Sequence, residues 1–155
     1  MLFFEHIPVG YCSEVGSWQL TAPDVIEFAK VWDPQSFHTD QEAAERSVYG
    51  ELVASSLHIF AICTKLFYDH SDRIQVMAML GKDRIKLLEP ARANDLLIYK
   101  TVCVEAKPSK SKLDRGIIVL ADTLARETGE VIMTQEVTLL VATSPEHACQ
   151  LDIES

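Results

Sequence analysis

The first half of the chain carries hydrophobic residues at helical spacing. Residues 21–33 (TAPDVIEFAKVWD) predict a helix with one apolar face. Thr21 is a suitable N-cap, and Pro23 fits the first helical turn. Pro34 disfavours helical geometry at Asp33, so we expect the helix to end there.

Three further elements complete this half. Residues 17–21 predict a short strand, and residues 39–47 predict a short helix capped by Thr39 or Asp40. Residues 51–70 (ELVASSLHIFAICTKLFYDH) are apolar on nearly all sides of a helical wheel. This pattern predicts a long helix that is buried on most of its sides.

From residue 74 onward, apolar and polar residues alternate with a period of two, which is typical of strands. About five consecutive strands are predicted, at residues 74–80, 83–89, 95–105, 115–125 and 130–141. The segment RETGE, residues 126–130, predicts a hairpin loop. Short connections favour antiparallel neighbours, so the predicted fold class is α+β.

A single helix that is apolar nearly all round needs a sheet that curls around it, which is the hotdog architecture. One such unit leaves a sheet edge and an apolar helix flank exposed. We therefore expect a homodimer or a higher homo-oligomer.

Length and charge narrow the possible functions. The chain has 155 residues and is 48% hydrophobic, which predicts one domain over residues 1–155. The net charge of -9 argues against binding to nucleic acid or to an anionic membrane surface. No apolar run approaches the ~20 residues of a spanning helix, and no signal peptide is recognisable. The four cysteines include no C-x-x-C pair and are expected to be reduced, so we expect a cytoplasmic protein.

The candidate chemistry begins at Asp33 and His38, which stand five positions apart around PQSF. Pro34 favours an extended or turn segment that can aim both side chains at one point. An aspartate beside a histidine can hold a water molecule and move its proton near neutral pH. The alternative is that Asp33 ends one helix and His38 lies beside the N-cap of the next.

A second element strengthens the catalytic interpretation. Tyr49 and Gly50 precede LVASS, which opens the long apolar helix. Helix N-termini present free backbone N–H groups, and these can stabilise an enolate oxygen formed from a thioester. Chemistry next to an acyl carbonyl needs both a group that handles water and an oxyanion site.

These residues also resemble a known family. FAKVWDPQSFHTDQEAA followed by VYGELVASSLH is similar to the hydratase signature of the MaoC-like dehydratases. The family pattern runs FA, then D-x-N-P-x-H or D-P-Q-P-x-H, then D-x-x-x-A, FG and A-[HS]-G. Three later segments are similar to further parts of the family: LGKDRIKLLEPARANDLL, KPSKSKLDRGIIVL and ETGEVIM. The resemblance covers roughly residues 17–141 and implies a hotdog protein related to the R-specific enoyl-CoA hydratases.

The resemblance implies reversible syn hydration of a trans-2-enoyl-CoA to an (R)-3-hydroxyacyl-CoA, in fatty acid metabolism. Asp33 and His38 match the pair that binds and activates water. Ser56 stands at the glycine of A-[HS]-G, so its backbone N–H is expected to bind the thioester carbonyl. The other expected substrate-binding residues are Tyr49, Gly50 and Ser55. No metal is implied, and coenzyme A enters only as part of the substrate.

The basic turn at residues 107–115 has two interpretations. Lys107, Lys110 and Lys112 can meet the phosphates of coenzyme A, which is often reached from the rim of a hotdog. The alternative is a solvated hairpin turn.

The chain departs from the family pattern at several positions. Ser36 stands where proline is usual, Glu51 where a second glycine is common, and ARAND (91–95) replaces P-G-D. Ser56 adds a side chain at the carbonyl site. Two alternatives to a hydratase therefore stay open: a hotdog acyl-CoA thioesterase, and a non-catalytic subunit that binds acyl thioesters.

Overall fold

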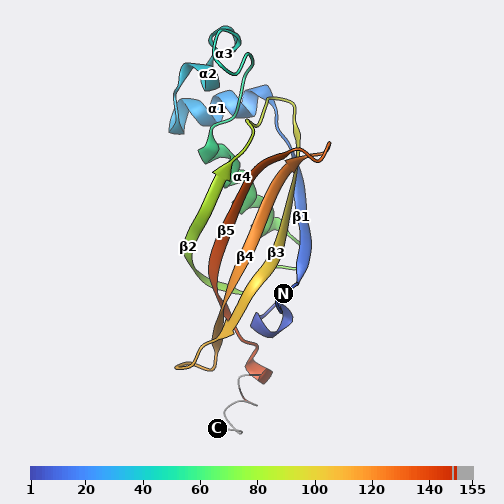
Figure 1. The fold of residues 1–155 in the computed structure, drawn as a ribbon. Coiled ribbons are helices and arrows are strands. Elements are labelled where there is room, and N and C mark those ends of the chain that lie inside the picture. The colour runs from blue at the N-terminus through green and yellow to red at the C-terminus, as the bar shows by residue number, and fades with distance from the viewer. Residues whose placement is uncertain (148, 150–155) are drawn as a thin grey trace.

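The computed structural model describes residues 1–147 and Cys149. The elements in chain order are η1 (Phe4–His6), β1 (Cys12–Gln19), α1 (Ala22–Trp32), α2 (Ser36–Thr39), α3 (Gln41–Glu45), α4 (Ser56–Asp69), β2 (Val76–Leu87), β3 (Leu96–Pro108), β4 (Arg115–Arg126) and β5 (Val131–Ala142). The strands form one antiparallel sheet in the order β1-β3-β4-β5-β2. Helix α4 crosses one face of this sheet, and α1, α2 and α3 gather beyond one end of the strands (Figure 1).

The strands after α4 differ from the prediction. Residues 74–80 and 83–89 were expected to form two strands, but they belong to the single strand β2. Its register against β5 shifts between Val76 and Ala78, between Met79 and Gly81, and between Asp83 and Lys86. Each shift interrupts the two-residue alternation and bends the strand while pairing continues. Four strands therefore follow α4, where five were predicted, and β1 is the fifth strand of the sheet.

Helix α4 is shorter and less enclosed than predicted. Residues 51–70 were expected to be helical, but the helix begins at Ser56, and the Ser55 hydroxyl caps it by accepting the Leu57 N–H at 3.2 Å. Its buried residues are His58, Ile59, Ile62, Cys63 and Leu66. Leu57 and Tyr68 are 48% and 64% exposed. The prediction of burial on most sides is wrong for this one chain, because the sheet covers one face of the helix.

The N-caps of two helices and the hairpin loop were predicted correctly. Thr21 caps α1 by accepting the N–H of Asp24, and the Asp40 carboxylate caps α3 by accepting the N–H of Ala43 at 2.7 Å. The predicted hairpin joins β4 to β5, with Gly129 in the left-handed region at a φ of 90°. Interactions between near neighbours in the chain determine all three features.

Two boundaries and one element differ from expectation. Strand β1 covers Cys12–Gln19, whereas residues 17–21 were predicted. Helix α3 covers only part of residues 39–47. Residues 36–39, expected to be extended or a turn, form the one-turn helix α2, because Pro34 restricts the residue before it and leaves the residues after it free to turn.

The N-terminal segment packs against the sheet at the end away from α1, α2 and α3. Phe4 of η1 packs on β4 at Gly116, where an added Cβ would lie 2.4 Å from the Phe4 ring. A glycine is therefore needed at this contact. Within residues 1–147, no helix combines the length and apolar character needed to cross a bilayer.

We predict that Gly116→Ala lowers the free energy of unfolding by about 1–3 kcal/mol, because the new methyl group displaces the Phe4 ring. Urea denaturation at fixed protein concentration measures this change. Gly81→Ala is the matched control, since its Cβ would meet only Asp83 Oδ2 at 3.4 Å, an ordinary contact. Equal effects of the two substitutions would contradict the prediction.

Candidate active site

The carboxylate of Asp33 is held at the C-terminal end of α1. The Asp33 N–H donates to Ala29 O at 2.9 Å and ends the helix. Its Oδ2 accepts the hydroxyl of Ser55 at 2.6 Å, and its Oδ1 accepts the amide of Gln35 at 2.9 Å. The side chain is therefore fixed by donors from two separate segments.

His38 faces Asp33 from the one-turn helix α2. Its side chain is buried, with the whole residue 6% exposed, and Nδ1 lies 2.6 Å from Val53 O. A carbonyl oxygen only accepts hydrogen bonds, so Nδ1 carries a proton and donates it. Nε2 is then the ring nitrogen directed at Asp33, 3.5 Å from Oδ2.

The surroundings of Asp33 favour its ionised form. The hydrogen bond from Ser55 is the main cause that lowers the pKa of Asp33, followed by the bond from Gln35, and attraction to His38 adds to them. The separation of 3.5 Å between Oδ2 and Nε2 is long for a direct hydrogen bond. A carboxylate and a neutral Nε2 are both acceptors, so together they can receive the two O–H groups of one water molecule.

The N-terminus of α4 supplies a donor next to this pair. Ser56 is the first residue of α4, so its N–H belongs to the group that has no carbonyl partner inside the helix. Among the described residues, Ser55 Oγ accepts the N–H of Leu57, while no hydrogen bond forms from the N–H of Ser56. The positive end of the helix dipole lies at the same place.

These groups line one cavity of about 410 Å³. Asp33, His38, Tyr49 and Ser56 contribute to its wall, and the residues after the end of β2 form another part of that wall. The cavity thus brings the Asp33–His38 pair and a helix N-terminus together. Within the described part of the chain, no cluster of three or more His, Cys, Asp or Glu residues is placed to hold a metal ion.

Other predicted site residues lie elsewhere. Ser55 is 1% exposed and holds Asp33 from behind the cavity wall. Gly50 is exposed in the loop after Tyr49, with a φ of 71°, and lies outside the cavity wall.

The basic turn is also distant from this cavity within one chain. Lys107 lies near the end of β3, and Lys110 and Lys112 belong to the connection between β3 and β4. This connection lies at the opposite end of the sheet from α1, α2 and α3 (Figure 1). Lys107 pairs with Glu105 there. A role in binding phosphate stays a prediction.

Comparison with known proteins identifies the family. The family model for the MaoC like domain matches residues 13–123. The chain belongs to the MaoC-like dehydratase family. The crystal structure of a MaoC-like dehydratase from Rhodospirillum rubrum is similar over 94% of this chain and 99% of its own, with 31% identity and a TM-score of 0.88. The predicted family resemblance is confirmed.

Two more distant structures establish the fold. The R-hydratase PhaJ1 from Pseudomonas aeruginosa covers 92% of this chain and 86% of its own, with 17% identity and a TM-score of 0.76. A Mycobacterium tuberculosis protein with a double hotdog fold covers 93% of this chain but 45% of its own, with 13% identity and a TM-score of 0.80. The MaoC-like chain therefore has the hotdog fold, as predicted.

One departure from the MaoC-like pattern has a local explanation. Ser36 stands where the family pattern has proline, and it is the first residue of α2. Proline is favoured at the first helical position because it needs no N–H partner there. A serine at this position is compatible with the same turn that carries His38.

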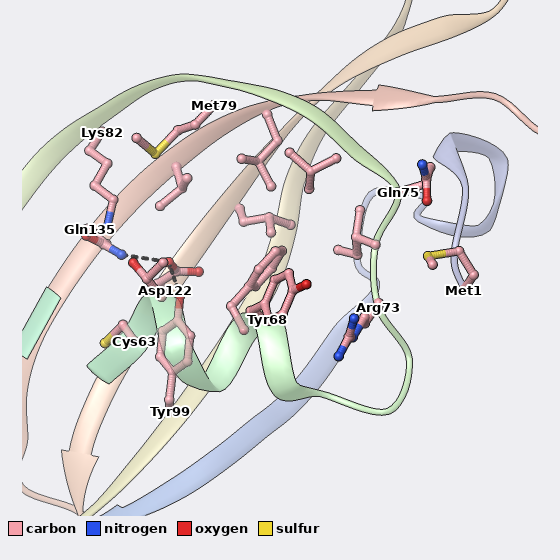
Figure 2. Close-up of a pocket in the computed structure, with 17 residues that line it drawn as sticks. Met1, Cys63, Tyr68, Arg73, Gln75, Met79, Lys82, Tyr99, Asp122 and Gln135 are labelled. Carbon is pink, nitrogen blue, oxygen red and sulfur yellow. Dashed lines mark hydrogen bonds between the residues drawn. The ribbon is translucent and has the colours of Figure 1, made fainter. Parts of the chain in front are cut away.

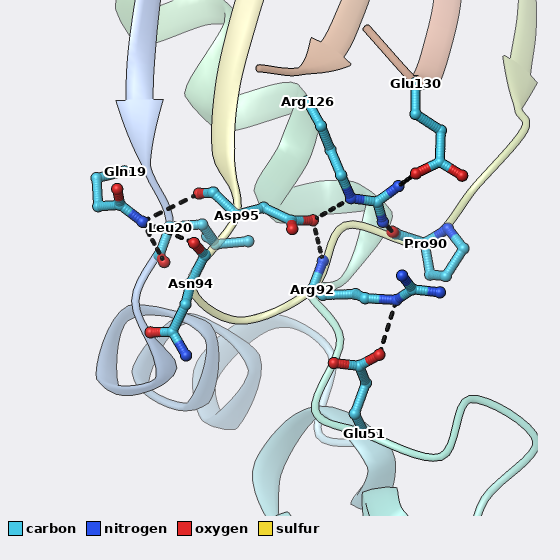
Figure 3. Close-up of polar contacts among 9 residues, drawn as sticks. All are labelled: Gln19, Leu20, Glu51, Pro90, Arg92, Asn94, Asp95, Arg126 and Glu130. Atoms are coloured by element: carbon cyan, nitrogen blue, oxygen red, sulfur yellow. Dashed lines mark hydrogen bonds and ion pairs between the residues drawn. The ribbon is translucent and has the colours of Figure 1, made fainter. Parts of the chain in front are cut away.

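No sequence pattern predicted the arginine that holds the part of the cavity wall formed after β2. The loop at 88–95 contributes to that wall, and Arg126, 7% exposed, binds it from β4 (Figure 3). Arg126 Nε lies 2.8 Å from Asp95 Oδ2, and its other nitrogens bind Glu130 and the carbonyl of Pro90. Arg126 and Asp95 are 31 positions apart, so no local pattern links them.

The same loop is tied to the segment that supports His38. Arg92 donates its N–H to Asp95 at 2.8 Å, and its Nε lies 2.8 Å from Glu51 Oε1 (Figure 3). Arg92 also forms an antiparallel bridge with Val53, whose carbonyl accepts the hydrogen bond from His38 Nδ1. Glu51, a departure from the MaoC-like pattern, therefore joins the two loops at the cavity.

We predict that carbon-detected NMR titration gives a pKa for Asp33 below 3.8 in the wild type. Ser55→Ala and Gln35→Leu each remove a donor to the carboxylate, so each raises that pKa. A folded-state pKa below the unfolded value stabilises the fold above the unfolded pKa. This contribution is lost as pH falls through the folded pKa.

Ser56→Ala is the control for this titration, because its side chain donates nothing to Asp33 among the described contacts. Gln35→Leu leaves the cap of α4 intact, so it separates the effect on pKa from the loss of the helix cap. An unchanged Asp33 pKa in both variants would contradict the proposed cause.

Proposed function

We propose that this protein is an enoyl-thioester hydratase, which adds water reversibly to a trans-2-enoyl-CoA and forms an (R)-3-hydroxyacyl-CoA. The observation that carries the proposal is the separation of 3.5 Å between Asp33 Oδ2 and His38 Nε2 in a cavity that Ser56 also lines. Membership of the MaoC-like dehydratase family supports it.

In this mechanism one water molecule donates its O–H groups to Asp33 and His38. Its oxygen attacks C3 of the enoyl group while one of its protons is taken by the pair. The electrons of the double bond move towards the carbonyl and form an enolate. A proton returned to C2 on the same face completes the syn addition, so the product contains all atoms of the water.

The enolate oxygen needs a donor that is already in place. The N–H of Ser56 supplies it at the start of α4, and the helix dipole favours the negative charge that develops there. The backbone donor survives the exchange of glycine for serine. Coenzyme A is required only as the carrier of the acyl group.

Wild-type protein mixed with enoyl-CoAs of increasing chain length should remove the absorbance of the conjugated thioester. Asp33→Asn should lower the rate by a factor on the order of 10²–10⁴, because it removes the negative charge that binds water. Asp40→Asn is the matched control, since asparagine also caps a helix well. Unchanged hydration by Asp33→Asn would refute this mechanism.

The same samples distinguish the two alternatives. Release of free thiol without formation of hydroxyacyl product would indicate a thioesterase. Tight binding of acyl-CoA without any turnover over the whole series would indicate a binding subunit.

We also propose that the protein forms a homodimer through β2. This strand is at one edge of the sheet, and it carries several exposed apolar residues: Met77, Met79, Leu80, Ile85 and Leu87. Unpaired edges and apolar surfaces of this kind favour association with another chain.

We predict that light scattering gives the mass of two chains for the wild type and of one chain for Leu80→Lys. The substitution puts a charge into the proposed interface at a residue that is 52% exposed, so the fold of one chain tolerates it. Val104→Lys on β3 is the control, since Val104 is 45% exposed and far from β2 in the sheet order. A Leu80→Lys protein with the mass of two chains would refute this interface.

A further inference from the structure

A second cavity, of about 470 Å³, lies between α4 and the sheet (Figure 2). Much of its wall is apolar and includes Phe67, Val137 and Leu139. The polar residues lie at two ends: Figure 2 shows Lys82, Gln135, Asp122 and Tyr99 at one end, and Arg73 and Gln75 at the other. We call the end with Lys82, Gln135, Asp122 and Tyr99 the inner end. A plain alkyl chain needs no polar group there, so these polar side chains require another explanation.

The two cavities follow one another along the same groove. On α4, Ile59 lines the first cavity, and Cys63, one helical turn later, lines the second. On β2, Leu87 lines the first cavity and Lys82 the second. A chain bound at Ser56 that passes Ile59 therefore moves towards Lys82.

The inner end is organised around a buried carboxylate. Asp122 is 2% exposed, and its Oδ2 accepts Tyr99 OH at 2.5 Å and Gln135 Nε2 at 2.9 Å. Its Oδ1 accepts the hydroxyl of Thr101 at 2.7 Å. Burial raises the pKa of Asp122, which reduces the negative charge that competes for a cation nearby. The three donors fix the position of this side chain.

This arrangement orients Lys82 towards the cavity. The Gln135 amide donates to Asp122, so its Oε1 is turned to Lys82, 3.4 Å from Nζ. An ammonium group has three N–H donors, and among the described residues Gln135 is the hydrogen-bonding partner of Lys82. Lys82 is partly buried, and its Nζ also lies 5.4 Å from the centre of the Phe60 ring. An acceptor on a ligand in this cavity can take the remaining N–H donors.

We propose that the acyl group of the substrate carries a carboxylate, which Lys82 binds at the inner end of this cavity. The inference rests on the proposed hydratase function and specifies its substrate class. Ser56 and Cys63 are seven positions apart on α4, so the carboxylate lies roughly 10 Å from the thioester carbonyl, at 1.5 Å per residue. The substrate is then the half-thioester of a dicarboxylic acid.

Saturated acyl-CoAs test the inference by calorimetry, because they lack the double bond and bind without reacting. Each chain length is compared with a methyl, a hydroxyl and a carboxylate at its end. We expect the best carboxylate ligand to bind roughly tenfold or more tightly than its methyl counterpart, as for a hydrogen bond between charged groups. Lys82→Met should remove this preference and leave the binding of the methyl series intact.

Lys86→Met is the matched control, since Lys86 belongs to the same strand, is exposed, and lies outside the wall of both cavities. It should keep the preference for carboxylate. A preference that survives in Lys82→Met, or equal binding of methyl and carboxylate ligands by the wild type, would overturn the inference. If the hydroxyl ligands bound as tightly as the carboxylate ligands, the proposed need for a negative charge on the ligand would be refuted.

These results are independent of the hydration assay. Hydration of plain enoyl-CoAs together with equal binding of the three series would sustain the proposed function and refute the carboxylate. A preference for carboxylate that depends on Lys82, without hydration of any enoyl-CoA, would refute the catalytic proposal and leave the binding site.

Discussion

The apolar face of α4 has to leave water, and the five-stranded sheet is the surface against which it does so. Ile59, Ile62, Cys63 and Leu66 are all buried at this contact. Burying them is favourable by roughly 1.5–3 kcal/mol for each large side chain. The packing fixes the direction of the helix, so its N-terminus lies at the end of the groove where Asp33 and His38 are found.

Polar groups that this packing removes from water are paired at both ends of the groove. His38 donates to Val53, and Arg126 binds Asp95 together with the loop at 88–95. Asp122 receives three hydrogen bonds beneath α4. An unpaired buried donor or acceptor costs about 1–3 kcal/mol, so each pairing constrains the loops around it. The candidate catalytic geometry thus depends in part on residues that do not line the first cavity, such as Arg126 and Asp95.

The residues that depart from the family pattern differ in the contacts that they make. Glu51 gains a partner in Arg92, and Ser36 fits the first position of α2. Ser56 keeps the free N–H but places a side chain in the cavity wall. The candidate pair of Asp33 and His38 therefore matches the family pattern, while Ser56 alters the cavity wall at the proposed carbonyl site.

Much of the fold and part of the site were predictable from residues close together in the sequence. Thr21, Asp40 and Gly129 act on neighbours within one turn, so their caps and loop could be identified directly. Asp33 and His38 are separated by five positions around a proline, and this spacing indicated a common target only together with the helix after LVASS and the family resemblance.

Tertiary structure decided what depends on distant partners. The bulges of β2 exist because pairing with β5 continues across GKD, which the pattern alone presents as a break. Ser55 was expected to contact substrate, but it lies behind Asp33 and lowers its pKa. Arg126 and the polar group around Asp122 were not anticipated, because hydrogen bonds between distant strands leave no periodic trace in the sequence. Local periodicity determines the elements, and only the folded chain determines which polar groups meet.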